Sequence, residues 1–200
     1  MRSLDPIRTA LARGPARTLS GSTRAAVAVV LLDQPAGAEL LLIERAERVG
    51  DPWSGHMAFP GGRVDLEDRD PQAAAERETR EEVGLDLASA ELLGRLDDLQ
   101  GGNALRGPLV LSAFVYQLAA RPPLVVQNDE VQNTLWVPLG MFFDPERHIG
   151  HTWGGLRMPG VLVGEPGRHV VWGLTYRLLD GLFTAAGTPF PTSATVRART

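Results

Sequence analysis

The 200-residue sequence predicts an α+β fold, arranged as an α/β/α sandwich, because short apolar strands are separated by two or three helices. Ala25–Leu32 is a β-branched, apolar run, which suits a buried strand. Gln72–Val83 is rich in residues of high helix propensity. His169–Ala185 carries valines and leucines at helical spacing, which predicts a C-terminal amphipathic helix.

Local signals organise the N-terminal part of the chain. A short helix is predicted to begin at Asp5-Pro6 and to end near Gly14-Pro15, because an Asp-Pro pair opens it and apolar residues follow at helical spacing. Glu39–Arg45 is expected to pair as a hairpin with Ala25–Leu32, since a turn at Pro35–Gly37 separates the two runs. Gly50–Gly62 has neither a helical nor a strand pattern and is interrupted by proline and glycine, so we expect a loop there.

The central helix has well-marked ends in the sequence. Asp70 is expected to be its N-cap, with Pro71 at the first helical position. Gly84 is expected to end the helix in a left-handed conformation. Three further strands and a short helix are predicted, in order, at Glu91–Asp97, Leu109–Leu118, Thr134–Val137 and Pro138–Phe143.

The length and composition favour one domain of ordinary size with additions at both ends. We expect residues 1–23 to form an N-terminal helical extension, residues 24–187 to form the domain with its C-terminal helix, and residues 188–200 to form a flexible tail. No cysteine is present, which excludes disulfides, thiolate zinc sites and cysteine nucleophiles. The net charge of −4 gives no reason to expect nucleic-acid or membrane binding. No stretch resembles a signal peptide or a transmembrane helix, so a cytoplasmic location is expected.

Three glutamates are expected on one face of the central helix. Glu78, Glu81 and Glu82 stand at positions i, i+3 and i+4, so their carboxylates project together. Without cations, each close pair would repel by about 0.2–0.5 kcal/mol. Hard divalent ions such as Mg²⁺ prefer oxygen ligands and therefore fit this face. Taken alone, such a face is more typical of a solvated helix surface, screened by Arg77 and Arg80.

The neighbouring residues favour metal binding, because the segment resembles the Nudix signature G-x5-E-x7-R-E-U-x-E-E-x-G-U, where U is a bulky aliphatic residue. Arg77–Leu85 matches the second half of this signature in register. One extra residue separates Gly62 from Arg77, so Asp68 falls where the first glutamate is expected. Thr79 replaces an aliphatic residue.

The resemblance implies a Nudix α/β/α sandwich with a mixed sheet, and hydrolysis of a nucleoside diphosphate linked to another moiety. Mg²⁺ is the implied cofactor, with Mn²⁺ as a substitute, and family habit allows a homodimer. Such ions neutralise the diphosphate and lower the pKa of a bound water, whose proton a carboxylate accepts. The implied metal ligands are Glu78, Glu81, Glu82 and the Gly61 carbonyl. The resemblance also implies that Arg77 orients the glutamates, and the proton acceptor is one of three alternatives: Glu81, Glu82 or Glu130.

The expected substrate follows from a stretch before the helix. Gly55–Gly62 fits the G-x3-F-P-G-G end of a motif in Nudix enzymes that act on coenzyme A. Upstream, Ile43 and Ala46 replace threonine and serine, and Asp51 stands where an arginine is expected. Coenzyme A or a derivative, cleaved to 4′-phosphopantetheine and adenosine 3′,5′-bisphosphate, is the first expectation. The candidate substrate contacts are Arg45, Arg48, His56, Phe59 and Gly62.

Two other functions remain open at this point. Within the enzyme class, ADP-ribose and (deoxy)nucleoside triphosphates are alternative substrates, because a fold does not choose among small-molecule nucleotide conjugates. A non-catalytic Nudix-fold domain that senses a nucleotide is the alternative from another class. The three helix glutamates favour the enzyme, since a sensing domain does not need them.

Overall fold

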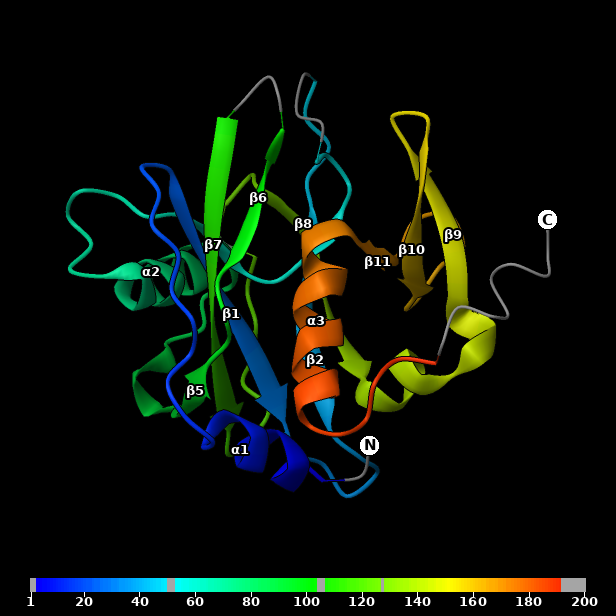
Figure 1. The fold of residues 1–200 in the computed structure, drawn as a ribbon, viewed down its shortest axis with the longest axis horizontal. Helices are drawn as coiled ribbons and strands as arrows, with labels where there is room; N and C mark the ends of the chain where they lie inside the picture. Colours follow the sequence, from blue (N-terminus) through cyan, green and yellow to red (C-terminus); the bar gives the residue numbers. More distant parts are fainter. Residues whose placement is uncertain (1–2, 50–52, 104–106, 127, 192–200) are drawn as a thin grey trace.

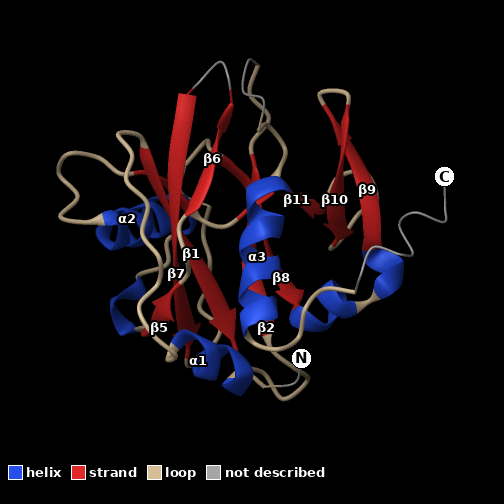
Figure 2. Ribbon diagram, in the orientation of Figure 1, coloured by secondary structure: helices blue, strands red, loops and turns tan. Residues whose placement is uncertain are grey.

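The computed structural model describes residues 3–49, 53–103, 107–126 and 128–191. Within these residues the chain forms three α-helices, one large sheet and one small sheet (Figures 1 and 2). The helices are α1 (Asp5–Leu11), α2 (Pro71–Val83) and α3 (Gly173–Ala185), with short 3-10 turns at Leu87–Ser89, Leu139–Phe143 and Pro145–Arg147. The large sheet contains β1 (Arg24–Leu32), β2 (Glu39–Arg45), β3 (Met57–Ala58), β4 (Gly61–Arg63), β5 (Glu91–Arg95), β6 (Leu99–Asn103), β7 (Gly107–Leu118) and β8 (Val131–Pro138). The small sheet contains β9 (His148–Trp153), β10 (Leu156–Leu162) and β11 (Val170–Trp172).

The large sheet is mixed, as predicted. Its main strand order is β3-β2-β1-β7-β5, while β4, β6 and β8 pair with β1, β7 and β2 respectively. β1 and β7 run parallel, and the other pairs are antiparallel. Leu31 lies opposite Leu40, which confirms the predicted hairpin of β1 and β2.

Helices cover both faces of this sheet, which confirms the predicted sandwich. One core layer joins the sheet to α3 and includes Val29 and Leu31 of β1. The other joins the sheet to α2 and includes Ala28 and Val30 of the same strand. Because both faces of β1 are buried, its sequence is continuously apolar instead of alternating. Figure 1 shows α2 and α3 on opposite sides of β1 and β7.

The predicted C-terminal helix begins later than its sequence pattern indicates. Val170–Trp172 is strand β11, which pairs with β10, and the helix begins only at Gly173. Val170 and Val171 fit the apolar face of either element, but both are β-branched and buried within the small sheet. Gly173 has a φ of 63°, which permits the abrupt change from strand to helix.

The predicted loop at Gly50–Gly62 is also wrong in part, because it contains β3 and the first two residues of β4. These strands are only two and three residues long, so they are too short to produce a periodic pattern. Strands β6, β9 and β10 were not predicted from the sequence. Asp51, the predicted departure from the coenzyme A motif, lies outside the described residues.

Both ends of the described chain contribute to the core. Leu4 and Ile7 at α1 are 1% and 0% exposed and belong to the layer beside α3. Phe190 is only 7% exposed and packs on Phe142 and Phe183, so its assignment to a flexible tail is wrong. The rest of that predicted tail, residues 192–200, lies outside the described residues. None of the described helices is long and apolar enough to cross a membrane.

Candidate active site

Helix α2 carries the three glutamates and is fixed at both ends by local contacts. The Asp70 side chain accepts a hydrogen bond of 2.8 Å from the Ala73 N–H, and Pro71 follows as the first helical residue. At the other end, Gly84 adopts a φ of 69° and donates its N–H to the Arg80 carbonyl. These contacts confirm both predicted caps.

Glu82 is the most deeply buried acid of the helix, with 1% of its surface exposed. One carboxylate oxygen accepts a hydrogen bond of 2.9 Å from the Gly61 N–H. Burial raises the pKa of Glu82 to about 8; the Gly61 hydrogen bond and Arg45 oppose the increase, and the charges of Glu78 and Glu130 add to it. The contacts with Gly61 and Arg45 therefore do not offset the cost of burying the ionised Glu82 carboxylate.

The double glycine brings β4 into close contact with α2. A Cβ atom at Gly61 would lie 2.3 Å from the Ala26 carbonyl oxygen, and the residue has a φ of 146°. A Cβ atom at Gly62 would lie 2.4 Å from a carboxylate oxygen of Glu78. Larger residues would therefore push the strand away from the neighbouring strand or from the glutamates.

Arg77 connects the loop before α2 to the glutamates. Its guanidinium contacts both carboxylate oxygens of Asp68, at 3.0 and 2.9 Å. It also donates to Glu78 at 3.0 Å and to Glu81 at 3.1 Å. The Arg77 hydrogen bonds hold the pKa of Asp68 below its usual value. Asp68 thus anchors Arg77, a role that its position in the signature did not by itself reveal.

Three other predicted site residues lie in the electrostatic surroundings of the glutamates. The Glu130 carboxylate forms a 3.1 Å ion pair with Arg48, and both side chains are about half exposed, at 48% and 47%. The charge of Glu130 raises the pKa of Glu78 and Glu82, whereas Arg45 lowers that of Glu82. The structure therefore gathers Arg45, Arg48 and Glu130 around the acidic face of α2.

Two predicted substrate contacts have other surroundings. The Phe59 side chain is 3% exposed and packs in the core layer beside α3, so we assign it to packing and correct its predicted contact with substrate. The His56 ring lies edge-on to the Trp172 ring, with 4.5 Å between their centroids. Sequence spacing could not reveal this contact, because Trp172 belongs to the unpredicted small sheet.

The chemistry of the glutamates fits a divalent cation. Three carboxylates share one helix face, and burial together with like charge raises the pKa of both Glu78 and Glu82. A cation would relieve this repulsion, and oxygen donors are what Mg²⁺ prefers. As the side chains are placed, no three acidic or histidine residues of the described chain form a complete metal site. Arg77 holds Glu78 and Glu81, so metal binding requires these side chains to readjust.

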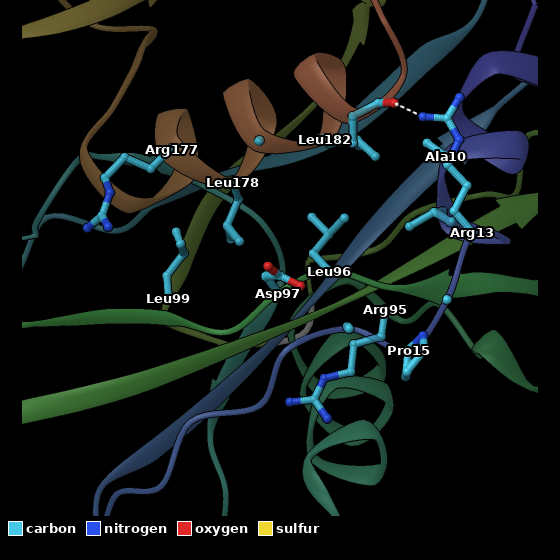
Figure 3. A pocket seen from close by; sticks show the side chains of 15 residues that line it. Ala10, Arg13, Pro15, Arg95, Leu96, Asp97, Leu99, Arg177, Leu178 and Leu182 are labelled. Atoms are coloured by element: carbon cyan, nitrogen blue, oxygen red, sulfur yellow. Dashed lines mark hydrogen bonds between the residues drawn. The ribbon is translucent and has the colours of Figure 1, made fainter.

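A cavity of about 390 Å³ lies elsewhere, among α1, β5, β6 and α3 (Figure 3). Its walls include Leu96, Leu99, Leu178 and Leu182. None of the predicted site residues lines this cavity, so we do not connect it with the glutamates of α2.

Comparisons with known proteins agree with this architecture. The NUDIX domain model matches residues 22–152. The mitochondrial coenzyme A diphosphatase NUDT8 of Mus musculus is 31% identical over 169 residues, which cover 84% of this chain and 80% of that protein. The MutT/nudix family protein of Enterococcus faecalis has the same fold, with a TM-score of 0.58, 20% identity and coverage of 91% of this chain and 68% of that one.

Two further relatives are considerably longer than the region they share with this chain. An uncharacterized protein of Schizosaccharomyces pombe is 44% identical over 111 residues, which are 54% of this chain and 34% of that protein. Nudix hydrolase 22, chloroplastic, of Arabidopsis thaliana is 27% identical over 162 residues, which are 78% of this chain and 53% of that protein. Since the family model covers well over half of the chain and the NUDT8 relative aligns with most of it, the chain belongs to the Nudix family.

Proposed function

We propose that this chain is a Mg²⁺-dependent hydrolase that cleaves the diphosphate bond of a nucleoside diphosphate linked to another moiety. The observation that carries the proposal is the state of Glu82: it is buried, faces the like charges of Glu78 and Glu130, and has a raised pKa. Strongly perturbed carboxylates of this kind are typical of functional sites. A sensing domain without catalysis would have no need for such an arrangement.

Each residue of the site has a proposed task. Glu78, Glu81 and Glu82 would hold the cation, with the Gly61 carbonyl as a further donor, while Arg77 orients the first two glutamates. When bound, Mg²⁺ or Mn²⁺ would neutralise the diphosphate and make a coordinated water more acidic. Arg45 and Arg48 would bind phosphate oxygens, which guanidinium groups recognise well.

Glu130 is our proposed acceptor of the proton from the attacking water. It lies outside α2, and its charge acts on both Glu78 and Glu82. Glu82 is less suited to this task, because its carboxylate is buried and accepts the Gly61 N–H. The half-exposed carboxylate of Glu130 can exchange a proton with solvent after each turnover.

Coenzyme A or a derivative is our first proposed substrate. The support comes from the motif at Gly55–Gly62 and from similarity to NUDT8, which is named a coenzyme A diphosphatase. Arg45 and Arg48 supply positive charge for a substrate with several phosphates. ADP-ribose and (deoxy)nucleoside triphosphates are the competing substrates within the same chemistry.

A substrate panel at millimolar Mg²⁺ tests the proposal, with products identified by mass. The panel contains coenzyme A, an acyl-coenzyme A, ADP-ribose, NADH, diadenosine polyphosphates and the (deoxy)nucleoside triphosphates. We expect 4′-phosphopantetheine and adenosine 3′,5′-bisphosphate from coenzyme A. Turnover of another compound alone would reject coenzyme A but keep the reaction class. No turnover of any compound by a folded, metal-binding protein would favour the sensing domain.

A further inference from the structure

Four aromatic rings gather where the small sheet meets the loop before β3. Trp172 lies at the centre, with its ring centroid 4.5 Å from His56, 4.7 Å from His151 and 5.4 Å from Trp153. We call these residues the aromatic cluster. They come from a loop of the large sheet and from two strands of the small sheet, so only the folded chain brings them together.

The small sheet leaves room for the central indole. Trp172 pairs with Gly160, and this glycine has no side chain to fill the space between β11 and β9. A Cβ atom there would already lie 3.4 Å from the His151 Cβ atom and 2.9 Å from Val170. Trp172 is therefore able to reach the rings of β9 while being only 9% exposed.

The outer members of the aromatic cluster keep part of their surface open. His56, His151 and Trp153 are each intermediate in exposure, unlike the buried Trp172. Desolvation lowers the pKa of His151, which favours its neutral, aromatic form near neutral pH. Partly exposed aromatic rings that pack on a buried one are suited to stacking against another planar ring.

A chain of contacts connects the aromatic cluster to the acidic face of α2. The Arg45 N–H donates to the His56 carbonyl at 3.1 Å, and the charge of Arg45 acts on Glu82. Between these residues, the Arg48 N–H donates to the Ser54 hydroxyl at 2.6 Å, while the Arg48 guanidinium pairs with Glu130. His56 thus contacts Arg45 of β2 through its carbonyl and the small sheet through its ring.

We propose that the aromatic cluster is the subsite for the base of the nucleotide substrate, with Trp153 and His151 as the stacking surface. The proposal rests on the diphosphohydrolase function proposed above. A substrate whose diphosphate lies at the glutamates would extend past Arg45 and Arg48 toward the rings. Stacking of a base on an aromatic side chain strengthens binding and tolerates different bases. The chemical class recognised is a planar heterocycle, for which a purine is the probe.

The test compares binding of ADP with binding of ribose 5-diphosphate, which carries the same diphosphate without a base. Isothermal titration calorimetry at millimolar Mg²⁺ measures both ligands on the full chain. We expect wild type to bind ADP more tightly, and Trp153→Leu to weaken ADP binding roughly 5- to 100-fold. The affinity of Trp153→Leu for ribose 5-diphosphate should equal that of wild type. Trp153→Phe, which keeps a ring, should restore most of the difference.

Trp136→Leu is the matched control, because this partly buried tryptophan lies on β8 with Arg121 over its ring at 5.1 Å. The subsite is rejected if wild type binds the two ligands equally, if Trp153→Leu leaves their ratio unchanged, or if Trp136→Leu changes the ratio as much. Failure of the proposed reaction gives a different result. ADP would then still bind more tightly than ribose 5-diphosphate, while the substrate panel would yield no products.

Discussion

Two buried carboxylates in this molecule have opposite surroundings. Glu82 on α2 and Asp98 before β6 are each 1% exposed. Asp98 accepts hydrogen bonds from the Leu19 N–H and the Ser112 hydroxyl, both at 2.8 Å, and contacts the guanidinium of Arg95. Glu82 accepts a hydrogen bond from the Gly61 N–H and faces other acids.

Their pKa values follow this difference. Burial alone would raise the pKa of Asp98, but its hydrogen bonds from Leu19, Arg95 and Ser112 hold it below the usual value. Burial raises the pKa of Glu82 to about 8, and one hydrogen bond does not cancel it. A satisfied buried acid stabilises the fold, whereas an under-compensated one is available to a ligand. We therefore expect replacement of Asp98 to reduce stability and replacement of Glu82 to reduce activity.

The largest expected effect is the loss of activity in Glu82→Gln. Replacing residues that support a metal ligand typically costs about 10–100-fold, so removal of a ligand charge should cost about 100-fold or more in kcat/KM. The fold should survive, because glutamine can still accept the Gly61 N–H. The measurement is hydrolysis of the best panel substrate, together with circular dichroism. Glu91→Gln, at an exposed acid paired with Arg8, is the control and should remain active. Near-native activity of Glu82→Gln would remove Glu82 from the site.

Asp98→Asn should produce the largest loss of stability. The amide keeps only one oxygen, so its NH2 group would face either the Leu19 N–H or Arg95, and one of these donors would lose its acceptor. Breaking a buried ion pair of this kind costs about 3 kcal/mol or more. Urea unfolding measures this loss, and Asp97→Asn is the control, because the Asp97 side chain is 58% exposed. Equal stability of the two variants would show that the Asp98 contacts contribute little.

The loss of stability in Asp98→Asn should depend on pH. The folded pKa of Asp98 is lowered, so its stabilisation is fully present above the unfolded pKa of about 4 and is lost as pH falls through the folded pKa. The gap in stability between wild type and Asp98→Asn should thus narrow below about pH 4. The contribution of Glu82 to stability has the opposite pH dependence. In metal-free protein it is present at low pH and is lost as pH rises through about 8. Urea midpoints between pH 3 and pH 9 test both directions, and a constant Asp98 gap would contradict the assignment.

Features that depend on neighbouring residues were predictable from the sequence, whereas those that depend on contacts between distant segments were not. The helix with its caps Asp70 and Gly84 was predicted correctly, because capping depends on neighbouring residues. The ring contact of His56 with Trp172 was not predicted, since it joins segments that are far apart in the chain. β9 and β10 were missed because their runs contain histidine, glycine and proline, which obscure a strand pattern. The acidic face of α2 was visible, whereas the burial that perturbs Glu82 required the packed β4.

Arg77→Lys should lower activity by roughly 10–100-fold while leaving most of the stability. Lysine keeps the charge but cannot contact both oxygens of Asp68 and the glutamates at once. If Arg77 orients the glutamates, the variant should also need more Mg²⁺ for half-maximal activity. Arg80→Lys is the control, because Arg80 is exposed on the same helix. An unchanged Mg²⁺ requirement would mean that Arg77 does not position the metal ligands.

The smallest effect is expected at Thr79, where the signature has an aliphatic residue. Its side chain is 0% exposed, and its hydroxyl donates to the Ala75 carbonyl at 2.7 Å, so the polar group is satisfied within the helix. Thr79→Val removes that bond but keeps the shape, and the Ala75 carbonyl retains its backbone partner in the helix. We expect a change in stability within about 1 kcal/mol and unchanged activity, measured by urea unfolding and turnover. Thr79→Leu adds volume to a packed site and should cost more, about 1–3 kcal/mol. If Thr79→Val destabilised the protein more than Thr79→Leu, the Thr79 hydroxyl would have a role beyond its hydrogen bond to Ala75. The apolar surroundings of α2 would then not explain why threonine replaces the aliphatic residue of the signature.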